Sequence, residues 1–232
     1  MTVRNRQVHN LFAFILPALG ILMLLLVSSM AQAAKPEVPP GKIPPVETFD
    51  YRDFGSGQTT QRVYAVTNGA GVTQIVEDIA RPPGQVIVTR SYWADTVKVQ
   101  AQVVTFLPTE TDLLLARIEH YDGVGTLQST SEFEPPLSIR QSSMPLGAMQ
   151  ASAGVLQRTP AGSPDTSEQG VTRWNVALGI EPDGELAGSL RMLEQHNSNR
   201  RMMWFYPGIG PIKRVQSDNG AIWRLSGCTG CP

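Results

Sequence analysis

Apolar and polar residues alternate through much of the chain beyond residue 60, and this period of two most constrains the fold. The alternation is unbroken in residues 97–103, and in residues 171–180 it separates Trp174 and Leu178 from Arg173 and Asn175. Such alternation is typical of a strand with one buried face. Beyond the first 33 residues no window has convincing helical periodicity. The sequence therefore predicts an all-β protein.

Turn signals divide the chain into further candidate strands. Asn-Gly, Pro-Gly and Asp-Gly pairs bound most of them, as in residues 67–69, 81–84 and 181–184. The other expected strands are residues 61–67, 72–79, 86–93, 113–121, 186–192, 202–206 and 212–216. Short strands at regular spacing predict an antiparallel sheet, strongly curled into a half-barrel or an open barrel.

Two segments between the expected strands are too rich in proline or glycine for plain strands. Residues 133–147 include the Pro135-Pro136 pair and Met144-Pro145, and we expect them to cross from one half of the sheet to the other. Residues 159–165 combine two prolines with a glycine, which indicates an exposed hairpin tip.

The first residues have the pattern of a secretory signal peptide. Arg4 and Arg6 precede an uncharged run over residues 11–29, and Ala31 and Ala33 provide an A-x-A cleavage site. We expect cleavage after Ala33 and an exported protein, periplasmic or secreted. An uncleaved N-terminal membrane anchor is the alternative. Residues 34–47 are proline-rich and indicate an extended spacer or a disordered N-terminus. Residues 48–232 remain as a single β-rich domain.

The charge of the chain argues against a nucleic-acid partner. The chain has 19 basic and 20 acidic residues, and removal of the first 33, with two arginines and no acid, leaves a net charge of −3. Nucleic-acid binding requires clustered positive charge. The sequence also has only four lysines.

Residues 204–213, WFYPGIGPIK, set three aromatic residues before a proline–glycine cluster. A phosphate-binding loop would need a helix to follow, whereas Asn219-Gly220 indicates another hairpin. We therefore expect a strand, a sharp corner and a second strand, with Gly208 and Gly210 in conformations that a β-carbon would strain.

This corner resembles the W-[YF]-A-P-G-[VI]-G-x-[VI]-K motif of exported bacterial β-rich proteins, most of them of unknown function. Residues 133–137, FEPPL, followed by Pro145-Leu146-Gly147, are similar to the Pro-Pro-Leu segment that precedes the corner in that group. The resemblance covers roughly residues 132–225. It implies a half-barrel of the lipoprotein-carrier type and carries no information about chemistry.

Two groups of side chains are candidates for ligand contact. The apolar group would line the concave face of the curled sheet or would fill its core; it comprises Trp174, Leu178, Leu190, Met192, Trp204 and Tyr206. The basic group would face across the corner toward an anionic group or would point separately into solvent; it comprises Arg200, Arg201, Lys213 and Arg214.

The two cysteines, Cys228 and Cys231, form a C-x-x-C pair. Redox chemistry of the thioredoxin type needs a helix start within a βαβ unit, so we expect an intramolecular disulfide. Intermolecular or exchange-active thiols are the alternative. His120 and His196 are isolated, and the sequence has neither a G-x-S-x-G nor an H-E-x-x-H motif. We assign no catalytic residue, no metal ligand and no cofactor.

These observations favour an exported, noncatalytic binding or interaction protein of the bacterial cell envelope. Its concave sheet would hold an apolar ligand or lipid, or it would contact another envelope protein. The alternative is an exported hydrolase whose site is not visible in the sequence. A pocket that joins a histidine to a carboxylate would favour the enzyme, and a continuous apolar trough would favour the carrier.

Overall fold

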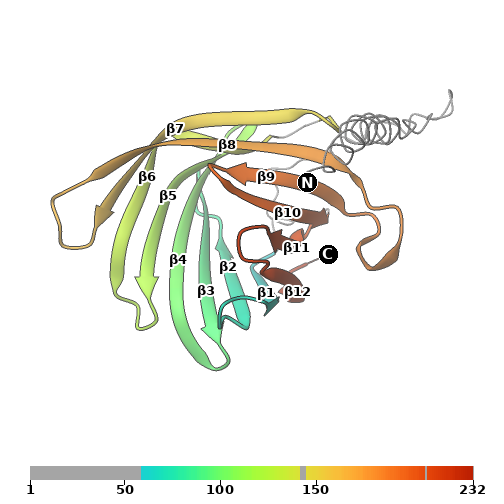
Figure 1. The fold of residues 1–232 in the computed structure, drawn as a ribbon, viewed down its shortest axis with the longest axis horizontal. Helices are drawn as coiled ribbons and strands as arrows, with labels where there is room; N and C mark the ends of the chain where they lie inside the picture. The colour runs from blue at the N-terminus through green and yellow to red at the C-terminus, as the bar shows by residue number, and fades with distance from the viewer. Residues whose placement is uncertain (1–58, 142–144, 207, 232) are drawn as a thin grey trace, which may run out of the picture. The chain divides into compact units, whose positions relative to one another are not determined.

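A computed structural model describes residues 59–141, 145–206 and 208–231. These residues form a closed antiparallel barrel of twelve strands (Figure 1). The strands are β1 (Gln61–Thr67), β2 (Gln74–Ala80), β3 (Val86–Ala94), β4 (Val97–Pro108), β5 (Asp112–Asp122), β6 (Leu127–Gln141), β7 (Met149–Pro160), β8 (Ser167–Ile180), β9 (Leu190–His196), β10 (Asn199–Tyr206), β11 (Gly210–Gln216) and β12 (Ile222–Thr229). Within the described residues, the one helical segment is the 3₁₀ turn η1 (Gly184–Leu186).

Each strand pairs with its neighbours in sequence, and β1 pairs with β12 to close the barrel. The closing register runs from Gln61 opposite Thr229 to Thr67 opposite Ile222. The all-β antiparallel class expected from the sequence is confirmed. The expected half-barrel or open barrel is corrected to a closed barrel, because strands at opposite ends of the domain pair with each other.

Most of the expected strands are present, and the differences have local causes. Residues 186–192 were expected as one strand, but η1 takes up residue 186 and β9 begins only at Leu190. The turn between β7 and β8 lies where the hairpin tip was expected, and its residues are mostly exposed. Strands β10 and β11 flank the Pro-Gly corner, and Gly208 and Gly210 have φ angles of 75° and 89°.

The proline-rich segment does not cross between halves of the sheet in its first part but continues strand β6. Against β5, Leu137 pairs with Leu115 while Glu132 pairs with Arg117, so four residues of β6 lie opposite a single residue of β5. Proline lacks the N–H group that a ladder needs and is tolerated at such bulges. The bulge therefore accommodates Pro135 and Pro136 within the strand.

The expected signal peptide of residues 1–33 and the spacer of residues 34–47 lie outside the described residues. In the part of the chain that the structure describes, no helix is long and apolar enough to cross a membrane.

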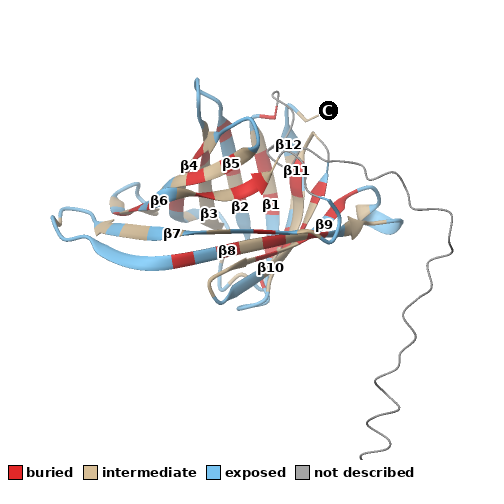
Figure 2. Ribbon diagram, turned by 90° about the horizontal axis from the view of Figure 1, so that it is seen from above, coloured by how far each residue is buried: buried red, intermediate tan, exposed pale blue. Residues whose placement is uncertain are grey.

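The inner face of the barrel carries three separate apolar clusters, and buried and exposed positions alternate along the strands (Figure 2). The first cluster comprises Ile79, Val88, Val104, Phe106, Leu113, Leu115, Phe133, Leu137, Ile139 and Val171. The second comprises Ala177, Leu190, Met192, Met203 and Phe205. The third comprises Tyr64, Val66, Ile75 and Trp223. A twelve-stranded barrel is wider than the eight-stranded kind that side chains just fill, so room remains between the clusters.

Candidate ligand-binding site inside the barrel

A first polar row crosses the inner face of five consecutive strands, β1 to β5. The register places Arg62 opposite Glu77, Glu77 opposite Arg90, Arg90 opposite Gln102, and Gln102 opposite His120. Residues directly opposite one another on the same face interact most strongly. The row therefore places Glu77 between two arginines and continues with two uncharged polar side chains, Gln102 and His120.

Glu77 is the anionic centre of this first row and is completely buried. Its Oε2 lies 2.9 Å from Arg62 Nη2, and its Oε1 lies 2.7 Å from Arg90 Nη2. The hydroxyl of Tyr64 donates to Oε2 at 3.2 Å. Arg214 of β11 is more distant, with Nη2 3.7 Å from Oε1. Glu77 is thus shared among three guanidinium groups.

A second polar row crosses β11 to β7. Arg201 lies opposite both Gln216 and Glu194, Asn175 lies opposite Glu194, and Gln150 lies opposite Asn175. The side-chain amide of Asn175 donates to Gln150 Oε1 at 3.0 Å. This row occupies the part of the barrel wall that the first row leaves.

Glu194 is the anionic centre of the second row and is also shared among three arginines. Its Oε1 contacts Arg140 Nη1 and accepts a hydrogen bond from Arg173 Nη2 at 2.7 Å. Its Oε2 accepts from Arg201 Nε at 2.5 Å. Arg140 and Arg173 are buried, whereas 34% of the Arg201 side chain is exposed.

Arginines outnumber glutamates around the two centres among the described residues. Three arginines surround each glutamate. Burial alone would raise the pKa of the Glu77 and Glu194 carboxyls, but the surrounding arginines hold both well below their ordinary value. Both carboxylates are therefore ionised at neutral pH.

The arginines also stay charged at neutral pH. Burial lowers the pKa of Arg140 to about 9. Burial lowers the pKa of Arg214 to about 10, against the opposing effect of Glu77, and the cations Arg90 and Arg201 lower it further.

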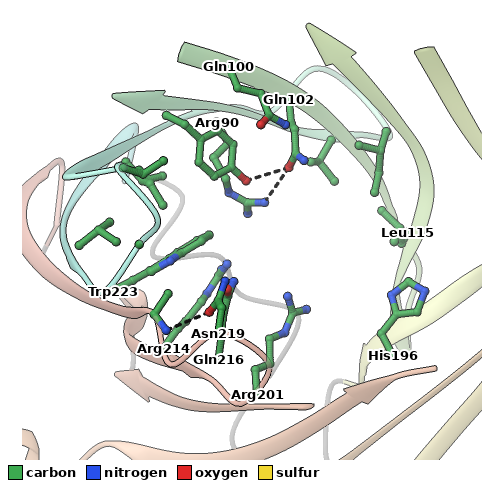
Figure 3. A pocket seen from close by; sticks show the side chains of 18 of the residues that line it. Arg90, Gln100, Gln102, Leu115, His196, Arg201, Arg214, Gln216, Asn219 and Trp223 are labelled. Atoms are coloured by element: carbon green, nitrogen blue, oxygen red, sulfur yellow. Dashed lines mark hydrogen bonds between the residues drawn. The ribbon is translucent and has the colours of Figure 1, made fainter. Parts of the chain in front are cut away.

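A cavity of about 440 Å³ lies between the two rows (Figure 3). Its polar wall comprises Arg90, Gln100, Gln102, Arg140, Arg173, His196, Arg201, Arg214, Gln216 and Asn219. Its apolar wall comprises Val104, Phe106, Leu115, Ile118 and Ile139. The other apolar and aromatic lining residues are Val66, Val72, Ile75, Tyr92, Ala221 and Trp223. None of the described lining residues carries a carboxylate, a hydroxyl on serine or threonine, or a thiol.

Several cationic donors along this cavity have no partner in the described part of the chain. Arg214 donates no hydrogen bond there, its buried Nε is unsatisfied, and its guanidinium lies 4.9 Å from the centre of the Trp223 ring. The Nε atoms of Arg140 and Arg173 are also buried and unsatisfied. Buried polar groups normally have a partner, and these three Nε atoms are exceptions within the described residues.

A second, polar cavity of about 390 Å³ adjoins the first at the β9–β10 and β11–β12 turns. His196, Arg201 and Gln216 line both cavities. The second one is otherwise lined by residues of the turns such as Asn197 and Asp218, which are exposed or half-buried. The adjoining cavity connects the interior with the exposed turns.

The six apolar candidates from the sequence fall on two faces of the sheet. Leu190 and Met192 are buried inside the barrel, in the second apolar cluster. Trp174 and Leu178 alternate with buried residues of β8 and point outward, and Leu178 is 39% exposed. The six side chains do not form one surface, and none of them lines the cavity.

Trp204 and Tyr206 alternate with the buried Met203 and Phe205 and also lie on the outer face. The indole Nε1 of Trp204 donates to Glu181 at 2.8 Å.

The four basic candidates from the sequence also do not lie together on one face of the sheet. Arg201 and Arg214 line the cavity, whereas Lys213 lies over the Trp204 ring at 4.7 Å on the outer face. Arg200 Nε donates to Gln195 at 2.7 Å. Arg201 lies opposite Gln216 and Arg214 lies opposite Met203, so the basic pairs do not face each other directly. Arg201 and Arg214 are instead diagonal neighbours on the inner face.

Sequence reasoning missed most of the charged interior. Arg62, Glu77, Arg90, Arg140, Arg173 and Glu194 are buried or nearly so, and none of them was among the candidate site residues. One signal was available: the chain has 15 arginines against four lysines. Arginine is the cation that proteins prefer for buried ion pairs.

The remaining candidates have structural surroundings. Cys228 and Cys231 form the expected disulfide. His120 Nδ1 lies 3.4 Å from Gln102 Nε2, and burial together with Arg158 lowers its pKa. Burial and the cations Arg173 and Arg201 lower the pKa of His196. Both imidazoles are therefore neutral at neutral pH, and the described residues contain no cluster of three or more potential metal ligands.

Fold and cavity together define a closed β-barrel with a cationic interior. No protein-family model, curated protein or solved structure matches this chain. The assignment of function therefore depends on the geometry of the cavity.

Proposed function

We propose that this protein is a noncatalytic binding protein of the bacterial cell envelope that holds an anionic amphiphile inside its barrel. The observation that carries the proposal is the composition of the cavity wall. Five arginines and no carboxylate are among the described lining residues, and Val104, Phe106, Leu115, Ile118 and Ile139 form an apolar wall. A ligand with an acidic head and a hydrocarbon body satisfies both groups.

The charge balance supports an anionic head. Uncompensated buried charge is costly, because the interior solvates ions poorly. An anion in the cavity would offset part of the charge of the five arginines that line it.

The apolar wall supports a hydrocarbon body of limited length. The cavity volume of about 440 Å³ lies within the usual range for small-ligand sites, about 300–1,000 Å³. Val104, Phe106 and Leu115 belong to the large apolar cluster of the barrel and also line the cavity. A bound alkyl chain would extend that cluster.

The lining residues support binding rather than hydrolysis. Among those described, His196 is the one imidazole, and no serine, threonine, cysteine, lysine, aspartate or glutamate lines the cavity. Nucleophilic catalysis needs a nucleophile within hydrogen-bond reach of its base. An envelope location is part of the proposal on the basis of the leader over residues 1–33.

Isothermal titration calorimetry with straight-chain carboxylates and alkyl phosphates tests the proposal. Each additional buried methylene contributes up to about 0.8 kcal/mol, roughly a fourfold gain in affinity. We expect affinity to rise with chain length and then level off when the cavity is full. A neutral alkyl glycoside of the same chain length should bind at least tenfold more weakly.

A pair of arginine variants provides a matched control. Arg201→Gln should weaken binding of the anionic amphiphiles at least tenfold, because Arg201 lines the cavity. Arg191→Gln should leave binding unchanged, because Arg191 pairs with Glu181 at 3.5 Å and is 45% exposed. Equal affinity for neutral and anionic amphiphiles, or no binding of either, would contradict the proposal.

A further inference from the structure

Two arginines of neighbouring strands are placed to hold a single head group. Arg201 of β10 and Arg214 of β11 are diagonal neighbours on the inner face, a relation that separates Cα atoms by about 7–8 Å. Both side chains project into the cavity from the β10–β11 wall (Figure 3). They are close enough for both guanidinium groups to contact one small anion.

Neither buried glutamate neutralises both of these arginines. Of the three arginines around Glu77, Arg214 is the most distant, with its Nη2 3.7 Å from Glu77 Oε1. It donates no hydrogen bond within the described residues. Arg201 uses only its Nε, which donates to Glu194; its two Nη groups donate to no described residue. Each arginine therefore presents an unused hydrogen-bonding edge.

Two side-chain amides lie beside this pair and have free donors of their own. Gln216 lies directly opposite Arg201, and its side-chain amide makes no hydrogen bond within the described residues. Asn219 uses its Oδ1 to accept from the backbone N–H of Ala221, which leaves its amide N–H groups unused there. Both residues line the cavity. The site thus offers two guanidinium forks and two amides to one ligand.

This donor set carries more charge than a carboxylate can balance. A carboxylate has a single negative charge and two oxygens, whereas the two guanidinium groups carry two positive charges. A phosphate monoester has a charge of about −1.5 to −2 at neutral pH and three terminal oxygens, which matches two guanidinium groups and their neighbouring amides. Building on the function proposed above, we infer that the barrel selects a phosphate monoester head, bound between Arg201 and Arg214.

The position of the pair also fits a phosphate with an attached apolar body. Arg201 and Gln216 lie where the two cavities adjoin, and the apolar wall with Leu115 and Ile139 completes the inner cavity. If the phosphate group binds where the two cavities adjoin, the hydrocarbon part of the ligand can contact the apolar wall. A lipid phosphate and free inorganic phosphate share the head chemistry and differ in this body.

Calorimetry with dodecyl phosphate, dodecanoate and inorganic phosphate at pH 7.5 separates the possibilities. We expect dodecyl phosphate to bind at least tenfold more tightly than dodecanoate and at least tenfold more tightly than inorganic phosphate. Its affinity should fall below about pH 6, where the phosphate takes up its second proton. Dodecanoate should keep its affinity to about pH 5, nearer the ordinary pKa of a carboxyl group.

Variants at the pair test the assignment of the head group. Arg214→Gln and Arg201→Gln should each reduce the affinity for dodecyl phosphate at least tenfold and abolish the preference over dodecanoate. Lys213→Gln is the matched control and should change neither, because Lys213 lies on the outer face over Trp204. The three-ligand comparison on the wild-type protein needs no variant to fold.

The outcomes distinguish this inference from the proposed function. If dodecanoate binds as tightly as dodecyl phosphate, the phosphate assignment is overturned and the amphiphile-binding function stands. If inorganic phosphate binds as tightly as dodecyl phosphate, the head-group site stands and the amphiphile is overturned. If none of the three ligands binds, both fail.

Discussion

Replacement of Glu194 by glutamine tests whether the buried charges hold the barrel together. Glutamine keeps the size and one carbonyl oxygen of the side chain but removes the charge. Arg140 and Arg173, with 5% and 4% of their side chains exposed, would then lose their counterion. Arg201, with 34% exposed, can turn toward solvent.

The expected loss follows from the two buried arginines. Removal of one partner of a buried ion pair costs about 3–5 kcal/mol. The glutamine oxygen can still accept hydrogen bonds from one or both guanidinium groups, so we expect this range for Glu194→Gln and not twice as much. For a domain of this size, each kcal/mol lowers Tm by about 2–4 °C, which gives a decrease of about 6–20 °C.

Thermal and urea denaturation at several pH values provide the assay. The folded-state pKa of Glu194 is lowered, so its contribution to stability is present above the unfolded-state pKa near 4.3 and is lost as pH falls through the folded-state pKa. The difference in unfolding free energy between wild type and variant should therefore be full at pH 7 and narrow progressively below about pH 5.

Glu185→Gln is the matched control. Glu185 accepts two hydrogen bonds of 2.7 Å from Arg224, but the two side chains are 67% and 51% exposed. Exposed pairs contribute at most about 1 kcal/mol. If Glu194→Gln is no less stable than Glu185→Gln at pH 7, the electrostatic account of the interior is refuted.

Three further outcomes can be measured by the same denaturation experiments. Gly208→Val should lower the unfolding free energy by about 1–3 kcal/mol, since a branched residue is strained at its φ of 75°; wild-type stability would contradict the strained corner. The double variant Cys228→Ser, Cys231→Ser should lose no more than about 2 kcal/mol, because the disulfide closes a very short loop; a larger loss would indicate a further role for the pair. Trp204→Ala should cost about 1–2 kcal/mol, below the 3–5 kcal/mol of a buried aromatic, because Trp204 is half-buried and contacts Glu181 from the outer face; a cost within the higher range would show that its packing is underestimated.

The sequence predicted the strands well because alternation is a local property. Strand β1 has the limits expected, Gln61–Thr67, and the Pro-Gly corner lies between two strands with Gly208 at positive φ. The disulfide between Cys228 and Cys231 is likewise a contact between near neighbours in sequence. Each of these depends on a few adjacent residues.

The interior could not be predicted because alternation separates two faces without identifying the inner one. In β8 the polar set with Arg173 and Asn175 is buried, and the set with Trp174 and Leu178 points outward. Arg173 can face inward because Glu194 of another strand meets it there. Such a pairing depends on the register of β8 against β9, which a single strand does not encode.

The pairing of β1 with β12 has a consequence for biosynthesis. Ser226 Oγ donates to the carbonyl oxygen of Val63, across 163 positions of the chain, so β1 leaves the ribosome long before its partner exists. Until β12 follows, β1 and β11 are open edges that can pair with other chains, and contacts so distant in sequence form slowly. Arg214 cannot approach Glu77 before this closure, because β12 lies between β11 and β1. We therefore expect the newly made chain to depend on protection from aggregation until its last strand has been synthesised.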